Sequence, residues 1–345
     1  MSITITFFPN VSVRGKLLEL AMMPLACLVS GCNGDGSGDT AGNLDKLTVA
    51  VVPKSTGGEF WETVEQGAND AAKELGVNLK WEGTLTETEI AEQNKIIENM
   101  INLGVDGLAL APLNAKANAK TAHSAIDAGI PVVVFDSALD SDKQVAFVAT
   151  DNVAGGGIAG KFITENLEGG KKKILVLRYV QGTASTENRA KGFMDAVGGA
   201  GFEVVADPFC EDGTVAGAKK TASNTLEGFV NDNVLELDGI FACNLYATLG
   251  MAEALDDLRK SNIAVNAKFV GFDSSPKLIT ELQAGKIDAL VSQDPKRMGY
   301  LAVETVVKHL KGEPVEAAVD TGVELVTKQR LENEPAIRKL VGLKE

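Results

Sequence analysis

The sequence predicts an α/β fold with two Rossmann-like parallel sheets, and three observations indicate it. From Leu47 onward, short apolar runs alternate with amphipathic stretches of helical length. Runs such as "GLALAP" and "PVVVFD" are apolar on consecutive residues, which is typical of strands covered on both faces in a parallel sheet. Ten such runs are too many for one comfortable sheet, so we expect two sheets of about five strands each, with a break near Asp151.

The boundaries of the expected elements follow from these runs. Strands are predicted at 47–53, 77–82, 107–112, 132–136, 145–149, 173–178, 203–207, 239–243, 268–272 and 289–292. Helical periodicity between most of them predicts crossover helices at 60–75, 87–102, 118–128, 185–197, 214–231 and 246–260. Strand, helix and parallel strand in succession form the repeating unit of such sheets.

The first 32 residues have the pattern of an export signal. Arg14 and Lys16 precede the mainly apolar stretch "LLELAMMPLACLVSGC", which ends in small residues and Cys32. Its end, "VSGC", resembles the bacterial lipobox, in which the cysteine is lipidated and becomes the mature N-terminus. We therefore expect a signal peptide at 1–32, a flexible tether at 33–46, and a lipid-anchored protein in the periplasm or at the cell surface. Because Glu19 is unfavourable in the apolar region, a disordered tail is the alternative.

Composition and motifs exclude several classes of function. With 45% hydrophobic and 23% charged residues the chain is an ordinary globular protein, and its net charge of −14 disfavours nucleic acid. His123 and His309 lack a cysteine or carboxylate at metal-ligand spacing, and no G-x-S-x-G elbow occurs. We expect no enzyme, no metal site and no cofactor.

Residues 155–161, "GGGIAGK", literally satisfy two phosphate-binding glycine patterns. A phosphate loop needs a hydroxyl after the lysine to bind magnesium, and Phe162 stands there. A dinucleotide site needs an acidic residue about twenty positions later, where this chain reads "KKKILVLRY". The expected role is therefore structural, with glycine letting the start of a helix pack closely on the sheet.

Two cysteines, Cys210 and Cys243, remain beyond the signal. An exported protein can form a disulfide, but two cysteines are no disulfide framework. Two unpaired buried thiols are the favoured interpretation, and a disulfide between them is the alternative.

Polar residues recur at the C-terminal ends of the expected strands, the edge at which open α/β folds bind ligands. These residues are Asp136, Asp151, Asn244, Asp273 and Gln293. One polar residue in this position usually caps the next helix, but five of them favour a shared polar pocket.

Six polar residues suit the recognition of sugar hydroxyls: Lys54, Asp136, Arg189, Asn244, Asp273 and Gln293. A hydroxyl both donates and accepts hydrogen bonds. Carboxylates and amides therefore bind it through pairs of planar hydrogen bonds, and the guanidinium group of an arginine bridges two oxygens. Phe60 and Trp61, where a strand ends and a helix begins, would supply apolar plates for the C–H faces of a sugar. For each polar residue alone, helix capping or a surface ion pair is an equally good explanation.

With these motifs in order, the chain resembles the ribose-type periplasmic binding proteins of ABC importers, which have the type I periplasmic binding protein fold. The resemblance runs from Leu47 to Gln329 through "VAVVPKSTGGEFW", "GLALAPLN", "GIPVVVFDS", "ATDNVAGGGIAG", "NRAKGF", "FACNLYATLG", "VGFDSSP" and "SQDPKRMGY". It implies two lobes, joined by three hinge strands, that close on a sugar. The lobes would be 47–150 with 294–322, and 151–293 with 323–345.

The resemblance also implies roles for individual residues. Asp136, Arg189, Asn244, Asp273 and Gln293 fall on sugar-binding positions, and Phe60 with Trp61 fall on the stacking pair. The chain departs from the family at four points: Lys54 replaces a small hydroxyl residue, Ala111 an amide, Ser137 an arginine, and Cys210-Glu211 an aromatic residue. Since one lost buried hydrogen bond costs on the order of 1–3 kcal/mol, these changes disfavour ribose itself. We expect another sugar or polyol, including one with an oxidised or anionic group.

The implied partners are a small sugar or polyol and an ABC permease, with the chain itself a monomer. The alternative is a sensor subunit that presents its bound sugar to a chemoreceptor or sensor kinase without any transport role. A repressor of the LacI type shares the fold but begins with a DNA-binding helix-turn-helix, where this acidic chain has its lipobox-like segment.

Overall fold

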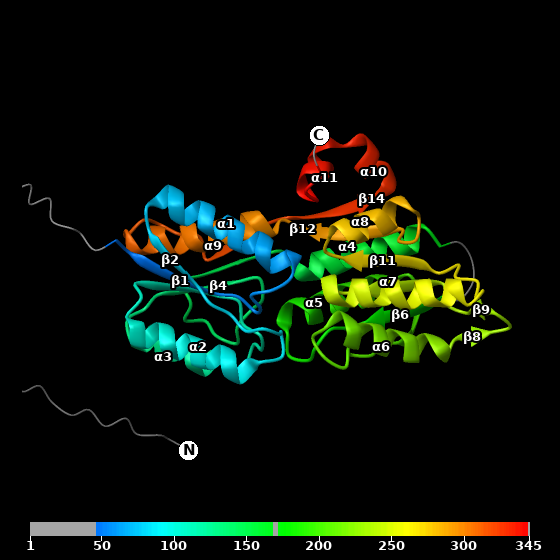
Figure 1. The fold of residues 1–345 in the computed structure, drawn as a ribbon, viewed down its shortest axis with the longest axis horizontal. Helices are drawn as coiled ribbons and strands as arrows, with labels where there is room; N and C mark the ends of the chain where they lie inside the picture. Colours follow the sequence, from blue (N-terminus) through cyan, green and yellow to red (C-terminus); the bar gives the residue numbers. More distant parts are fainter. Residues whose placement is uncertain (1–45, 168–171, 344–345) are drawn as a thin grey trace, which may run out of the picture. The chain divides into compact units, whose positions relative to one another are not determined.

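The computed structural model describes residues 46–167 and 172–343, so the predicted signal peptide and Cys32 lie outside the described residues. Two six-stranded sheets form the framework (Figure 1). The first has the order β13-β5-β4-β3-β1-β2, and all its neighbouring strands are parallel. These strands are β13 (Ala318–Asp320), β5 (Ala146–Ala149), β4 (Val132–Phe135), β3 (Gly107–Leu110), β1 (Thr48–Val52) and β2 (Asn78–Trp81).

The second sheet has the order β14-β12-β11-β10-β6-β7, and only its edge strand β14 is antiparallel to its neighbour. Its strands are β14 (Val323–Thr327), β12 (Ala289–Gln293), β11 (Lys268–Phe272), β10 (Gly239–Ala242), β6 (Lys173–Leu177) and β7 (Glu203–Ala206). The α/β fold class and the ten predicted strands are therefore confirmed. Each sheet gains one further edge strand, β13 or β14, that the apolar runs did not indicate.

Helices cover both faces of the first sheet. In β1, Val49 and Val51 pack into one apolar cluster and Ala50 and Val52 into another, on the opposite face. Helices α1 (Glu59–Leu75) and α9 (Pro295–Leu310) supply the first cluster, and α2 (Ile90–Leu103) and α3 (Ala119–Asp127) supply the second (Figure 1). This two-sided burial is the reason that the strands are apolar on consecutive residues.

The second sheet carries the remaining helices in the described part of the chain. They are α4 (Asn152–Glu165), α5 (Ala184–Gly199), α6 (Val215–Glu227), α7 (Leu245–Lys260) and α8 (Pro276–Gln283), followed after β14 by α10 (Lys328–Asn333) and α11 (Pro335–Leu340). Among all helices described, none combines the length and the apolar character needed to span a bilayer.

The helix predicted at 214–231 is too long. It ends at Glu227, and the chain continues into a small hairpin of β8 (Val230–Asn231) and β9 (Val234–Leu235). Asp232 and Asn233 both have positive φ angles, 46° and 59°, as the tight turns that match the twist of a hairpin require. The turn chemistry of these two residues overrides the helical periodicity that precedes it.

The glycine-rich stretch 155–161 lies inside α4 and has two packing roles. A Cβ on Gly155 would lie 3.1 Å from the Phe272 ring of β11, in keeping with the expected approach to the sheet. Gly156 instead faces α5, where its Cβ would lie 2.0 Å from the carbonyl oxygen of Arg189. The glycines thus bring the backbones of α4 and α5 into contact, which holds the turn of α5 that carries Arg189.

The chain crosses between the two sheets three times: after β5, after β12, and between β13 and β14. Hydrogen bonds join the first and last crossings. Thr150 Oγ1 lies 3.1 Å from Thr321 Oγ1 and donates to the Gly322 carbonyl oxygen at 3.2 Å. Both threonines are buried. The first and last crossings are therefore joined by hydrogen bonds and are not independent linkers.

Candidate ligand-binding site

The carboxyl ends of the central strands of both sheets meet at one buried cleft. Its lining consists of Lys54, Phe60, Trp61, Glu87, Asp136, Ser185, Thr186, Arg189, Asn244, Leu245, Tyr246, Asp273 and Gln293. All of the side chains predicted for the ligand site except Ser137 are in this set. The free volume is about 20 Å³, on the order of a single water molecule, so the cleft is closed in this structure.

Lys54 and Asp136, both from the first sheet, form a buried ion pair with 2.6 Å between Nζ and Oδ2. Lys54 Nζ also donates to Ser185 Oγ at 3.1 Å, at the start of α5 on the second sheet. The lysine that replaces the family's small hydroxyl therefore bridges the cleft. Its charge is matched by Asp136, which argues against its serving as an unpaired cation for an anionic ligand.

Ser137, directly after Asp136, is buried behind the cleft. Its Oγ accepts a hydrogen bond from the Ser185 backbone N–H at 3.0 Å. Ser137 thereby holds the start of α5 against the end of β4.

Arg189 is held rigidly from four sides. Its Nε donates to Asn152 Oδ1 at 2.7 Å and its Nη1 to the Cys243 carbonyl oxygen at 3.2 Å. The guanidinium carbon lies 3.9 Å from the centre of the Phe272 ring, and Nη1 lies 3.8 Å from Asp273 Oδ2. Because the guanidinium group of Arg189 is already fixed, it can donate its remaining N–H groups to a ligand without a further loss of side-chain entropy.

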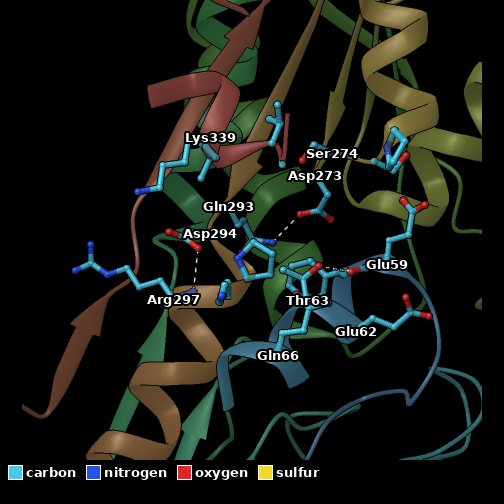
Figure 2. Close-up of a pocket in the computed structure, with 18 of the residues that line it drawn as sticks. Glu59, Glu62, Thr63, Gln66, Asp273, Ser274, Gln293, Asp294, Arg297 and Lys339 are labelled. Atoms are coloured by element: carbon cyan, nitrogen blue, oxygen red, sulfur yellow. Dashed lines mark hydrogen bonds between the residues drawn. The ribbon is translucent and has the colours of Figure 1, made fainter. Parts of the chain in front are cut away.

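Asp273 is positioned by two donors, as Figure 2 shows in part. Gln293 Nε2 donates to Oδ1 at 2.7 Å, and the Leu245 backbone N–H donates to Oδ2 at 2.9 Å. Burial raises the pKa of this carboxyl above its ordinary value, although Arg189 and the two donors oppose that shift. Gln293 Oε1 is buried and lacks a hydrogen-bond partner within the described residues, so an acceptor is left at the cleft.

Two strand-end residues do cap helices, which was the alternative to ligand binding. Asn244 Oδ1 accepts from the Ala247 backbone N–H at 3.0 Å at the start of α7, yet Asn244 also lines the cleft. Asp151 caps α4 through the Ala154 N–H at 2.9 Å, is exposed, and is absent from the cleft lining. Of the five strand-end residues, Asp151 alone is only a cap.

Phe60 and Trp61 meet edge to face, with ring centres 5.0 Å apart and planes at 88°. Trp61 is almost fully buried, packs edge-on against Phe135, and donates from Nε1 to Glu87 Oε1 at 2.7 Å. Phe60 is only half-buried. The two rings are therefore perpendicular surfaces, one set in the core and one at the rim of the cleft.

Sequence reasoning missed four polar or aromatic lining residues. Ser185 and Thr186 begin α5, Tyr246 lies in the first turn of α7, and Glu87 lies between β2 and α2. First-turn residues of helices that start at the binding edge were a usable signal for three of them. Glu87 is the first residue of the helix predicted at 87–102, but α2 begins only at Ile90, so Glu87 lies in the irregular segment before the helix.

A larger groove of about 880 Å³ adjoins the cleft and shares Phe60, Asp273 and Gln293 with it (Figure 2). The first turn of α1, with Glu59 and Glu62, forms one wall. Lys339 of α11 contributes to another (Figure 2). The shared residues place this groove directly beside the cleft.

Cys210 and Cys243 are buried and unpaired, as the sequence indicated. Burial raises the pKa of each thiol to about 12, so both stay protonated. Within the described residues no cluster of three or more His, Cys, Asp or Glu side chains could hold a metal ion.

Comparison with known proteins identifies the fold and the family. Residues 49–314 match the family described as periplasmic binding protein domain. The ribose import binding protein RbsB of Escherichia coli (strain K12) is 31% identical over 314 residues, which cover 89% of this chain and 99% of that protein.

Two solved structures are similar over the whole of their own chains. A carbohydrate transporter solute binding protein from Agrobacterium radiobacter, in complex with D-arabinose, has a TM-score of 0.80 and 31% identity and covers 87% of this chain. An ABC transporter solute binding protein from Agrobacterium vitis with bound D-fucose has a TM-score of 0.79 and 32% identity and covers 86%.

These relatives are binding proteins of transport systems rather than enzymes, in agreement with the sequence-based expectation, and the family implies an extracytoplasmic location. The match over most of the chain and the two-sheet fold together show that the chain belongs to the periplasmic binding protein domain family.

Proposed function

We propose that the protein captures a monosaccharide or related polyol in the cleft between its two sheets and delivers it to an ABC permease. The observation that carries this proposal is the convergence of Lys54, Asp136, Arg189, Asn244, Asp273 and Gln293 at one buried cleft beside Phe60 and Trp61. Relatives that bind ribose, D-arabinose and D-fucose support the class of ligand.

The proposed roles follow from the donors and acceptors that each side chain offers. Asp136 and Asp273 accept from ligand hydroxyls, Arg189 donates to ring or hydroxyl oxygens, and Asn244 and Gln293 do both. Phe60 and Trp61 cover apolar C–H faces of the ligand. Lys54 donates its remaining N–H, and Ser137 acts through the start of α5, where its Oγ binds the Ser185 N–H.

Two lobes that hinge at the three crossings would admit the ligand. The lobes are residues 47–150 with 294–322, and 151–293 with 323–345. Because about 20 Å³ cannot hold a monosaccharide, the cleft must open before binding and close afterwards. Ligand contacts to both lobes supply the differential affinity that favours the closed state.

A lipid on Cys32 would anchor the protein to the outer face of a membrane, close to the permease. Metabolic labelling with a lipid precursor should mark the wild-type protein and fail to mark Cys32→Ser. Labelling of both proteins, or of neither, would remove the anchor from the proposal without affecting the cleft.

A thermal-shift screen against pentoses, hexoses, polyols and sugar acids tests the function, because a ligand that binds only the folded state raises its stability by mass action. At least one sugar or polyol should raise the melting temperature of the wild type. Asp136→Ala should abolish this shift, whereas exposed Asp142→Ala should retain it. The absence of any shift across the screen would refute the proposed function.

The alternative partner is a membrane sensor, a chemoreceptor or sensor kinase, that binds the closed, sugar-loaded form of the protein. Loss of sugar uptake on deletion of the gene would support transport. Normal uptake combined with a lost chemotactic or transcriptional response to the same sugar would favour the sensor.

A further inference from the structure

We propose that the ligand is a sugar or polyol that carries a protonated amine, and that Glu87 is the carboxylate that receives this amine. The inference rests on the proposed function and specifies the class of ligand. It differs from the anionic ligand that Lys54 suggested in the sequence.

The charges that line the cleft are unbalanced. Three carboxylates, Asp136, Asp273 and Glu87, face two cations, Lys54 and Arg189. Lys54 pairs with Asp136 at 2.6 Å, and Arg189 lies 3.8 Å from Asp273. Among the ion pairs of the described residues, none involves Glu87. The pairing therefore leaves Glu87 as the one lining carboxylate that is not in an ion pair with a described residue.

Leaving the Glu87 carboxylate outside an ion pair is energetically unfavourable. The residue is 7% exposed, and within the described part of the chain its carboxylate accepts one hydrogen bond, from the neutral indole of Trp61 at 2.7 Å. A buried carboxylate that lacks a cation is unfavourable, and burial raises the pKa of Glu87 although Lys54 and the indole oppose this. A ligand ammonium in the cleft would replace the missing cation.

The aromatic residues of the cleft suit the same group. Phe60, Trp61 and Tyr246 line it together with the three carboxylates, and aromatic faces attract desolvated ammonium groups. A sugar acid would instead add a fourth negative charge to a closed, buried space. A neutral sugar would leave Glu87 either unpaired or protonated.

The experiment compares related ligands in which one substituent is neutral, cationic or anionic. The probes are glucose, galactose and mannose, each as the parent sugar, the 2-amino-2-deoxy sugar and the uronate, at pH 7. Melting-temperature shifts rank them, and calorimetry gives the dissociation constants of those that bind. The proteins are the wild type, Glu87→Gln, and Glu82→Gln as an exposed control in the same segment with the same change of charge.

In at least one series the amino sugar should bind the wild type roughly 10- to 100-fold more tightly than its parent, as a charge-assisted hydrogen bond provides. The uronate should bind more weakly than the parent. Glu87→Gln should lose this preference for the amine, whereas Glu82→Gln should retain it. The carboxamide introduced by Glu87→Gln would still accept from the indole of Trp61, so a purely structural role for Glu87 predicts no change in preference.

If the parent or the uronate binds best in every series, or if Glu87→Gln keeps the amine preference, the inference is overturned and sugar capture stands. If no probe and no sugar or polyol of the wider screen shifts the melting temperature, the proposed function fails as well.

Discussion

Asp136 and Asp273 occupy equivalent places in the two sheets. Each follows a phenylalanine at the end of a strand, β4 or β11, and each is followed by a serine. Both have left-handed backbone conformations, with φ of 60° and 70°, which aspartate tolerates better than most residues. Each carboxylate faces one cation, Lys54 or Arg189. The two halves thus present the same carboxylate–cation unit from opposite sides of the cleft.

The Lys54–Asp136 pair should be energetically coupled. Removing either partner leaves the other as a buried, unpaired charge, so Lys54→Ser and Asp136→Ala should each destabilise the protein, and the double variant by less than their sum. A coupling of about 1–3 kcal/mol is expected for residues in direct contact. Urea unfolding of the four proteins measures it. Additive effects would show that the two charges are not energetically coupled.

The contact between α4 and α5 depends on Gly156. Gly156→Ala would place a Cβ 2.0 Å from the Arg189 carbonyl oxygen, so it should push α5 away and destabilise the protein by about 1–3 kcal/mol. Because Arg189 moves with α5, ligand affinity should fall as well. At Gly157 the nearest atom is 4.0 Å away, so Gly157→Ala should be neutral or stabilising by up to about 1 kcal/mol. Equal melting temperatures of the two variants would contradict this packing.

The threonine contacts at the crossings should matter for stability and closure. Thr150→Val keeps the shape of the side chain but removes its hydrogen bonds to Thr321 and Gly322. We expect a loss of about 1–3 kcal/mol in urea unfolding, together with a changed ligand affinity. Thr225→Val, which removes a hydrogen bond within α6, is the control for the loss of a hydroxyl and should leave the affinity unchanged.

The raised pKa of Glu87 predicts a particular dependence of stability on pH. Burial favours the neutral form of Glu87 in the folded protein. The contribution of Glu87 to the free energy of unfolding is therefore fully present below its ordinary pKa of 4.5, and it is lost as the pH rises through the folded pKa. Lys54 opposes the effect, and Asp136 and Asp273 reinforce it. Compared with the wild type, Glu87→Gln should therefore be more stable at pH 7, and the difference should shrink toward pH 4.

Melting curves of the ligand-free proteins from pH 4 to pH 8 check this prediction. Asp273, whose pKa is also raised by burial, is present in both proteins and cancels in the difference. A difference that grows as the pH falls would mean that Glu87 is stabilised as the anion in the folded state.

The strands were predictable because both faces of each sheet are covered, which forces apolar residues into consecutive positions, as at 132–135. The apolar pattern did not predict the edge strands β13 and β14, because most of their residues are exposed or half-buried and they lack such runs. The strand-end carboxylates were predictable for a similar reason: parallel strands present their carboxyl ends at one edge.

The sequence by itself determined the fold class, the binding edge, and the residue types that could recognise a polyol. Only the tertiary structure decided how their charges combine. Lys54 and Asp136 are 82 residues apart in the chain yet share one ion pair, and Glu87 acquires its significance from lacking such a partner. Electrostatic energy depends on distance and burial in space, which periodicity along the chain does not encode.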